Sequence, residues 1–410
     1  MKKNKKAERK RGDWQAVQRQ RPFLRLCFLL VFGRFSSIGF VVVLPLFICQ
    51  VGCGVCLYWR GEAEPLVYIQ AHATVPFHRK FIFLIDYIFS LCYNDVNIVI
   101  YIKRADLMRK LSKEQFQKMD AWMQKNARAF DRAKWNYIFN GGTKEAIVEE
   151  MLKYQNNDGG IGNGFEADLL CPSSSAIATA EAIFQAYEYG LDCNASWFEK
   201  ILEYFENSTQ DIPKYWEDLP LEAMEYPHAP WWNCEPCTIF NPNPCAIVAS
   251  AFILYGTETQ KQLGYRIANE CFDLLVSNDF CGDHDTLNIK ALVEQLYSIK
   301  SPLITEEIIS SLRRRIVENT CFDKSKWNEY YFNPFDYVSS PNSLWYSDVE
   351  KGIEDTINFL LDTINEQGVW EPNFSWGVDS DISRQVTENW KGYITVKRAK
   401  TLLNFGRIEQ

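Results

Sequence analysis

Two carboxylates close a glycine-rich stretch, KYQNNDGGIGNGFEAD, that covers residues 153–168. Glu166 and Asp168 stand two residues apart, and neighbouring acids can act as general acid and base because each raises the pKa of the other. A structural alternative is that they balance the dipole at the start of the next helix, since Pro172 and Ser173 follow. As a catalytic pair they would transfer protons to a sugar or to a polyprenyl chain.

A second pair of acids, Asp283 and Asp285, flanks His284. Two acids so close could raise each other's pKa and supply a proton donor. Asp285 stands directly before Thr286 and a helical pattern, so an N-cap role explains its position without any partner. We therefore keep both acids as catalytic candidates and favour capping for Asp285.

Four side chains are candidates for substrate binding: His228, Trp231, Trp232 and Trp376. Indole rings can stack on a sugar or line an apolar pocket, although tryptophans in turns also serve as packing wedges. Three of the four lie in residues 207–244, a segment rich in proline and tryptophan. It is too long for a simple connector and too aromatic for a disordered linker, which predicts an ordered loop across the mouth of a site.

Neither a metal nor a cofactor is expected. Cys234 and Cys237 have the spacing of zinc ligands, with His228 and His284 as possible partners, but a single Cys-x-x-Cys pair is a weak signal. The glycine run lacks the preceding strand of a dinucleotide fingerprint, and its acids lack the spacing of an EF-hand. The glycines instead suit a tight turn.

The elements around these residues read as helices. Capping residues precede stretches with apolar side chains at helical spacing from Ser112 onward, and no convincing strand follows. Residues 244–256 are small or apolar nearly all round, whereas residues 305–319 show one apolar stripe and a charged back, which indicates inner and outer helices. The pattern predicts an all-α fold in which paired helices form two layers, as an α/α barrel or a solenoid.

Residues 1–107 differ from residues 108–410. They carry 16 Lys and Arg against 7 Asp and Glu, which leaves 28 against 45 in the rest of the chain. The acidic part argues against binding nucleic acid, because phosphate contacts need clustered Lys and Arg. The uncharged run 35–59 is long enough to span a membrane, so a membrane anchor is one reading of this extension. A mis-assigned start before Met108 is the other.

The membrane alternatives depend on residues 35–102. A second apolar run, 81–102, contains two Asp residues that oppose insertion. Any membrane contact is expected only through these residues, if they are expressed. The cysteines beyond residue 108 form no dense framework and suit a reducing compartment, which predicts a cytoplasmic protein, with anchoring through 35–59 as the alternative.

The glycine turn has a weaker echo in NEQGVW, residues 365–370, which also follows an amphipathic helix. Recurrence of a helix and a polar-glycine turn is typical of stacked helix pairs. With these turns, HAPWW and the C-terminal NWKGYITVKRAKTLLNFGRI, the chain resembles the terpenoid-cyclase and protein-prenyltransferase superfamily, most of all its uncharacterised bacterial members. The resemblance covers about residues 111–408 and implies an α/α toroid with squalene-cyclase-like repeats.

The resemblance implies a protein that binds or transforms a hydrophobic isoprenoid in the toroid mouth, so the expected partner is a small-molecule or lipid-like substrate. The full Asp-x-Asp-Asp motif of the cyclases is absent, and fold does not fix function. Two alternatives stay open: a carbohydrate-active α/α barrel with paired carboxylates, and a non-catalytic binding scaffold. Whether the chain is an enzyme is not decided by its sequence.

Overall fold

The computed structural model describes residues 27–35, 38–46, 54–58, 68–72, 108–210, 215–233, 239–277 and 282–409. The chain divides into two compact units, Met1–Met108 and Arg109–Gln410. In the first unit, strand β1 (Cys27–Phe35) pairs antiparallel with β2 (Ile38–Leu46), and β3 (Gly54–Tyr58) pairs antiparallel with β4 (Tyr68–His72).

The membrane helix considered for residues 35–59 is replaced by strands wherever this range is described. Val41 to Val43 lie opposite Phe32, Val31 and Leu30 in the β1–β2 pair, and β-branched side chains favour such a pleated surface. Among the described residues, no helix has both the length and the apolar character that crossing a membrane requires. The second apolar run, 81–102, lies outside the described residues, and the cellular location stays a prediction.

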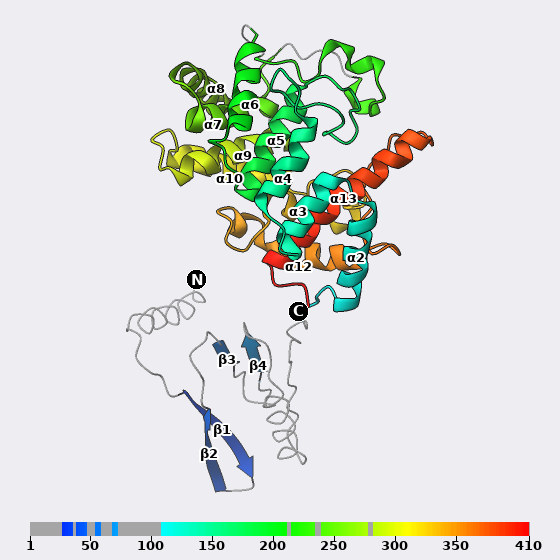
Figure 1. Ribbon diagram of the computed structural model, residues 1–410. Coiled ribbons are helices and arrows are strands. Elements are labelled where there is room, and N and C mark those ends of the chain that lie inside the picture. Colours follow the sequence, from blue (N-terminus) through cyan, green and yellow to red (C-terminus); the bar gives the residue numbers. More distant parts are fainter. Residues whose placement is uncertain are drawn as a thin grey trace, which may run out of the picture. The chain divides into compact units, whose positions relative to one another are not determined.

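The second unit is helical, as expected (Figure 1). Its α-helices are α2 (Lys113–Asn126), α3 (Ala129–Phe139), α4 (Lys144–Met151), α5 (Ala176–Tyr189), α6 (Ser196–Asn207), α7 (Pro242–Tyr255), α8 (Glu258–Val276), α9 (Asp283–Ser298), α10 (Glu306–Asn319), α11 (Pro334–Tyr337), α12 (Tyr346–Asp362) and α13 (Asp381–Asn404). Short 3₁₀ helices cover Leu152–Tyr154, Leu221–Glu225, Pro230–Trp232 and Lys324–Lys326. The prediction of an all-α toroid is confirmed for this unit.

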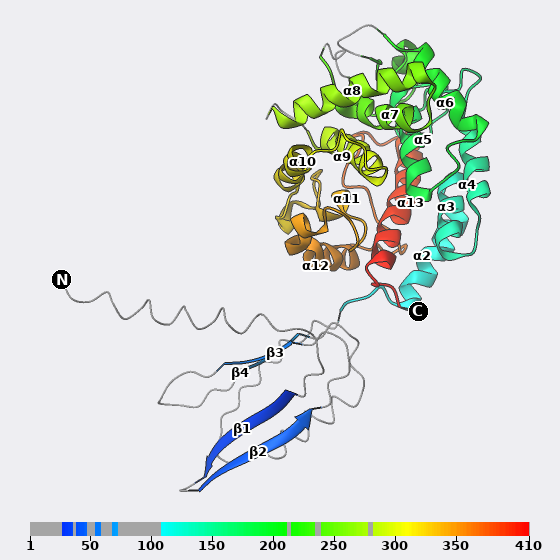
Figure 2. The same ribbon diagram turned by 90° about the vertical axis from the view of Figure 1, so that its left-hand side faces the viewer.

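Inner and outer helices alternate along the chain. In α7, eleven of the side chains, from Pro242 to Ile253, are buried, whereas α10 buries a single stripe that includes Ile308, Leu312 and Ile316. Figure 2 shows α5, α7, α9 and α13 toward the centre, with α4, α6, α8 and α10 outside them. Of the inner helices, α5 and α7 are small or apolar nearly all round because they are covered on both sides.

The two ends of the toroid close on each other. Leu111 and Ile408 form a parallel bridge, in which the Leu111 amide donates to the Arg407 carbonyl at 2.8 Å and the Glu409 amide donates to the Leu111 carbonyl at 2.9 Å. Helix α13 also packs against α3. This closure brings the C-terminal helix beside elements almost 300 residues earlier and favours a ring over an open solenoid.

The glycine turn and its echo have the same geometry. Gly159 and Gly368 both have φ of +90°, and in each turn the glycine amide donates to an asparagine carbonyl three residues earlier, of Asn156 at 3.1 Å and of Asn365 at 2.9 Å. The first turn is also fixed to α5, because the Ile161 amide donates to the Thr179 hydroxyl at 2.9 Å. The repeat predicted from sequence is therefore a repeated backbone turn, and it sets the path of the chain that follows.

Replacing Gly159 by Ala is expected to lower the free energy of unfolding by at least about 2 kcal/mol, because the added Cβ would lie 2.2 Å from the Lys200 carbonyl oxygen at a left-handed φ. Gly377 is the matched control: its φ is +72° and no atom lies within 4 Å of a Cβ there, so G377A should cost only about 1 kcal/mol of backbone strain. Equilibrium denaturant unfolding measures both, and equal losses would contradict this account of the turn.

Candidate active site

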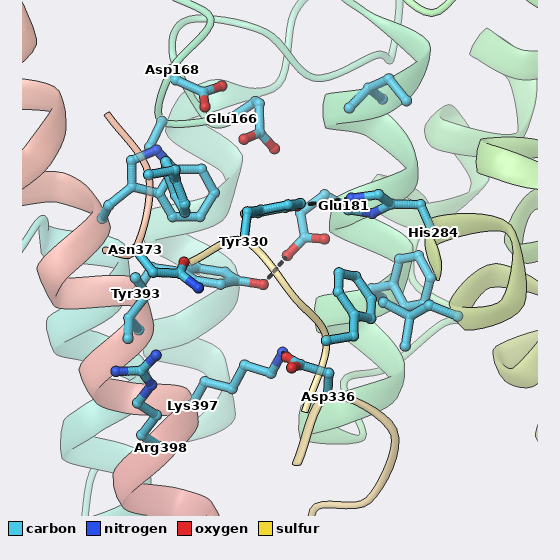
Figure 3. A pocket seen from close by; sticks show the side chains of 18 of the residues that line it. Glu166, Asp168, Glu181, His284, Tyr330, Asp336, Asn373, Tyr393, Lys397 and Arg398 are labelled. Carbon is cyan, nitrogen blue, oxygen red and sulfur yellow. Dashed lines mark hydrogen bonds and ion pairs between the residues drawn. The ribbon is translucent and has the colours of Figure 1, made fainter. Parts of the chain in front are cut away.

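A cavity of about 720 Å³ opens at the centre of the toroid (Figure 3). Its walls come from the start of α3, the inner helices α5, α7, α9, α11 and α13, and the loops that follow the glycine turn and precede α11. Aromatic rings dominate the lining: Phe130, Phe165, Phe184, Trp231, Trp232, Tyr330, Tyr331, Phe332, Phe335, Phe374, Trp390 and Tyr393. The cavity is thus shaped for a mainly apolar ligand.

Glu166 and Asp168 line one end of this cavity as neighbouring carboxyl groups. Burial and the neighbouring Asp168 raise the pKa of the Glu166 carboxyl well above its usual range. Burial also raises the pKa of Asp168, but the Trp232 indole N–H donates to Asp168 Oδ1 at 2.9 Å and stabilises its charged form. Of the two carboxyl groups, Glu166 therefore holds a proton more tightly than Asp168.

The tryptophan-rich segment is attached to this pair through the backbone as well. The Ala229 amide donates to the Asp168 carbonyl at 2.9 Å, and Leu169 forms an antiparallel bridge with His228. These bonds position Trp232, which follows directly in the short 3₁₀ helix. The segment thus fixes one carboxyl of the pair from outside the ring of helices.

A third acid, Glu181 on α5, lies farther along the same wall. The Tyr393 hydroxyl on α13 donates to Glu181 Oε1 at 3.2 Å, and the Gln185 amide donates to the same oxygen at 2.7 Å (Figure 3). Burial raises the pKa of Glu181, although the Lys134 ammonium opposes this effect. The cavity therefore holds three acids, Asp168, Glu166 and Glu181, apart from Asp336 of α11.

A buried ion network supports this wall from behind. Asp131 binds Arg128 at 2.8 Å and Lys134 at 2.9 Å, and its side chain is fully buried. Arg128 Nη1 also donates to the Phe165 carbonyl at 3.0 Å, next to Glu166. The network links α3 to the loop that carries the acid pair, so its charges contribute to the position of Glu166.

Half of the residues proposed from sequence meet in the cavity. Glu166, Asp168, Trp231 and Trp232 line it. Asp283 and Asp285 lie outside its lining at the first turn of α9, where Asp285 Oδ2 accepts the Gly282 amide at 3.0 Å. Gly282 is the N-cap and Asp285 is the third helical residue, so the carboxylate satisfies the helix start from inside the helix.

The remaining two candidates also lie off the cavity. His228 is held by Tyr226 O at 2.6 Å and Asn233 Oδ1 at 2.9 Å, which turns its ring toward its own loop. Trp376 lines a separate surface depression together with Asp379 and Arg384. Whether these side chains line the cavity depends on the path of their loops, which the spacing of residues in the sequence does not predict.

The sequence reasoning missed several cavity residues. Glu181 had a usable signal, because it is the only charged residue in the first three turns of an otherwise small and apolar inner helix. His284 lines the cavity although its flanking acids do not, and its Nε2 lies 2.9 Å from the Tyr330 hydroxyl. Lys397 and Arg398 read as an ordinary charged face of α13, and no local pattern set them apart.

The metal reading of Cys234 and Cys237 falls outside the described residues. Within the part that the structure describes, no group of three or more His, Cys, Asp or Glu side chains is arranged to hold a metal ion.

Changing Trp232 to Phe should raise the pKa of Asp168, because the indole N–H that stabilises the carboxylate is removed while most of the packing is kept. Site-selective carboxyl ¹³C NMR titration would detect the shift. Trp231 is the matched control, since its ring is 42% exposed and packs edge-on against Phe374, and W231F should leave both carboxyl titrations unchanged. An unshifted Asp168 in W232F would show that this indole does not tune the pair.

Comparison with known proteins finds distant structural similarity. No protein-family model and no curated protein matches the chain. Two solved structures are similar, both of variants of the type II terpene cyclase MstE from Scytonema in complex with geranylgeranyl dihydroxybenzoate. Each is 9% identical and covers 70% of this chain; the first covers 96% of its own chain with a TM-score of 0.40, the second 97% with 0.39. A likeness this distant carries no conclusion about this chain.

Proposed function

We propose that this protein binds an apolar, isoprenoid-like substrate in the toroid cavity and protonates one of its carbon–carbon double bonds, the first step of a cyclisation. The single observation that carries the proposal is the Glu166–Asp168 pair in the wall of an aromatic cavity. A buried acid that keeps its proton near neutral pH is what such a step requires.

Glu166 is the proton donor in this step. Glu166 gives its proton to one alkene carbon, and the π electrons of that bond form the new C–H bond, which leaves a carbocation on the other carbon. Aromatic faces such as those of Phe165 and Trp390 stabilise the cation through their quadrupoles. A second double bond attacks the cation and closes a ring, and loss of a proton from carbon restores an alkene. Glu166 then regains a proton from solvent.

His284 is the cavity residue best suited to accept the final proton. Burial lowers the pKa of its imidazole, which favours the neutral ring with its one basic nitrogen. It lies on α9, across the cavity from the acid pair (Figure 3). Separation of acid and base prevents the two from neutralising each other within the empty site.

The carbohydrate alternative fits the geometry less well. Glycosidases place their two carboxyl groups about 5 to 9.5 Å apart on opposite sides of the bond to be cut. Glu166 and Asp168 stand two residues apart on one loop, and Asp168 acts on the pKa of Glu166, an arrangement unlike two groups on opposite sides of a bond. The scaffold alternative gives no reason for a buried acid whose ionisation burial opposes, since an apolar residue would pack there at lower cost.

The proposal is tested by incubating the purified full chain with a panel of polyprenyl alcohols and acids, together with oligosaccharides, and analysing the products by mass spectrometry. We expect a cyclic isomer of one polyprenyl compound, with unchanged mass, and no cleavage of any sugar. Thermal-shift measurements on the same panel report binding without turnover, because a ligand at 100 times its Kd stabilises by about 2.7 kcal/mol. Sugar cleavage, or binding of sugars alone, would contradict the proposal.

A further inference from the structure

The cavity carries opposite charges at its two ends (Figure 3). Glu166 and Asp168 lie at one end, and Lys397 and Arg398 on α13 lie at the other, with Asp336 of α11 beside them. All five side chains line the same space. A ligand that reaches the acid pair with one end therefore meets two cations with its other end.

Arg398 is the distinctive group at this far end. Its guanidinium lies 6.0 Å from the centre of the Trp370 ring, and within the described chain no carboxylate forms an ion pair with it and no hydrogen bond to it is formed. Burial lowers the pKa of Arg398 to about 10, and the charge of Asp336 offsets this only in part. Arg398 is half-buried, and a guanidinium that faces a cavity with no carboxylate bound to it is suited to bind an anionic ligand.

Lys397 is in a different state, because its ammonium pairs with Asp336 Oδ1 at 3.1 Å. With one carboxylate against two cations, the three groups leave a single positive charge at this end. A carboxylate carries one negative charge and matches the planar fork of a guanidinium with two parallel hydrogen bonds. A diphosphate brings several negative charges, more than this end neutralises.

We propose that Arg398, supported by Lys397, binds the carboxylate of the substrate, which is an apolar acid whose hydrocarbon chain extends toward the acid pair. This assignment rests on the proposed function for the orientation of the chain. The anchor also fixes the orientation of the substrate in the cavity: its charged head lies at α13 and its neutral alkene end lies at Glu166. It also predicts specificity, since the same chain with an uncharged head loses its anchor.

Isothermal titration calorimetry on the full chain tests the anchor with three probes that share one hydrocarbon chain: geranylgeranoic acid, geranylgeraniol and geranylgeranyl diphosphate. We expect the acid to bind at least about 10-fold more tightly than the alcohol, as charge-assisted hydrogen bonds would give. R398Q should lower the affinity for the acid by about 10- to 100-fold and change the affinity for the alcohol by less than about 3-fold.

Two further variants control for the charge of Arg398 and for the loss of an arginine from α13. R398K retains the charge and loses the fork, so it should recover only part of the preference for the acid. R384Q removes an arginine of the same helix that pairs with Asp379 and Asp381 on the surface, and it should leave all three affinities unchanged. Circular dichroism and Tm confirm that each variant is folded.

The outcomes separate the anchor from the proposed function. Equal affinity of the wild-type chain for acid and alcohol would overturn the anchor while leaving an isoprenoid cavity in place. Tighter binding of the diphosphate than of the acid would overturn the choice of a carboxylate. Failure of all three probes to bind would overturn the proposed function together with the anchor.

Discussion

Replacing Glu166 by Gln is expected to lower the rate of product formation by about three orders of magnitude, within the range usual for loss of a general acid. The amide keeps the size of the side chain and its place beside Asp168, but it has no proton of useful acidity. Binding of substrate should change little, because the proton is used only in the transition state. Single-turnover kinetics and calorimetry measure the two effects separately.

The matched control is Glu203→Gln, since Glu203 is an exposed acid on the outer helix α6. E203Q should retain wild-type activity. An E166Q protein that forms product at a third or more of the wild-type rate would remove Glu166 from the mechanism. Loss of binding together with activity would show a structural role in place of a catalytic one.

The pH dependence of the wild-type rate follows from the same group. Neighbouring charge and burial raise the pKa of Glu166 above its usual value, so the carboxyl stays protonated to a higher pH than an exposed glutamic acid. Activity should hold at pH values where an ordinary glutamic acid is ionised and fall as pH rises through the raised pKa. A rate that rises with pH across this range would indicate that the ionised form is the active one.

The largest effect on stability is expected at Asp131. Removing its carboxylate by Asp131→Ala leaves Arg128 and Lys134 as two buried cations without a counter-charge, which should lower the free energy of unfolding by about 3–5 kcal/mol. Denaturant unfolding at equilibrium measures the loss. The control is Asp379→Ala at an exposed pair with Arg384, where the change should stay below about 1 kcal/mol.

The Asp131 network should make the free energy of unfolding depend on pH, with the loss on the acid side. Arg128 and Lys134 hold the pKa of Asp131 below its usual value in spite of burial. Its contribution to stability is therefore present above the pKa of the unfolded chain and is lost as pH falls through the lowered pKa of the folded chain. A D131A protein within 1 kcal/mol of wild type would show that the network is not needed for stability.

Much of the fold could be predicted because local signals and packing agree. Helix starts carry visible caps, as at Ser112 with its capping box, and the contrast between all-apolar and striped helices already separated inner from outer layers. The Gly159 turn and its echo at Gly368 were recognisable because a left-handed φ demands a small set of residues. Glu166 and Asp168 could be predicted to lie close together because they stand two residues apart in the chain.

The rest of the cavity depends on contacts that spacing does not encode. Tyr393 meets Glu181 across 212 positions, and Lys397 meets Asp336 across 61 positions. The hydrophobic run at residues 35–59 has a composition that suits a strand pair or a membrane span alike, so its described parts differ from the expected helix. The paths of their loops keep His228 and Trp376 out of the cavity lining, although their residue types suit ligand binding as well as those of Trp231 and Trp232.

The most direct test of the central claim is the mass of the product formed in D₂O from the acid or alcohol that the chain transforms. Glu166 exchanges its proton with solvent, so protonation of the alkene by Glu166 places a single deuterium on carbon, and the cyclic product should be heavier by about one mass unit than the product formed in H₂O. E166Q, with a rate about three orders of magnitude lower, should form almost none of this labelled product in the same time. A cyclic product made by the wild-type chain in D₂O without deuterium on carbon would contradict the account.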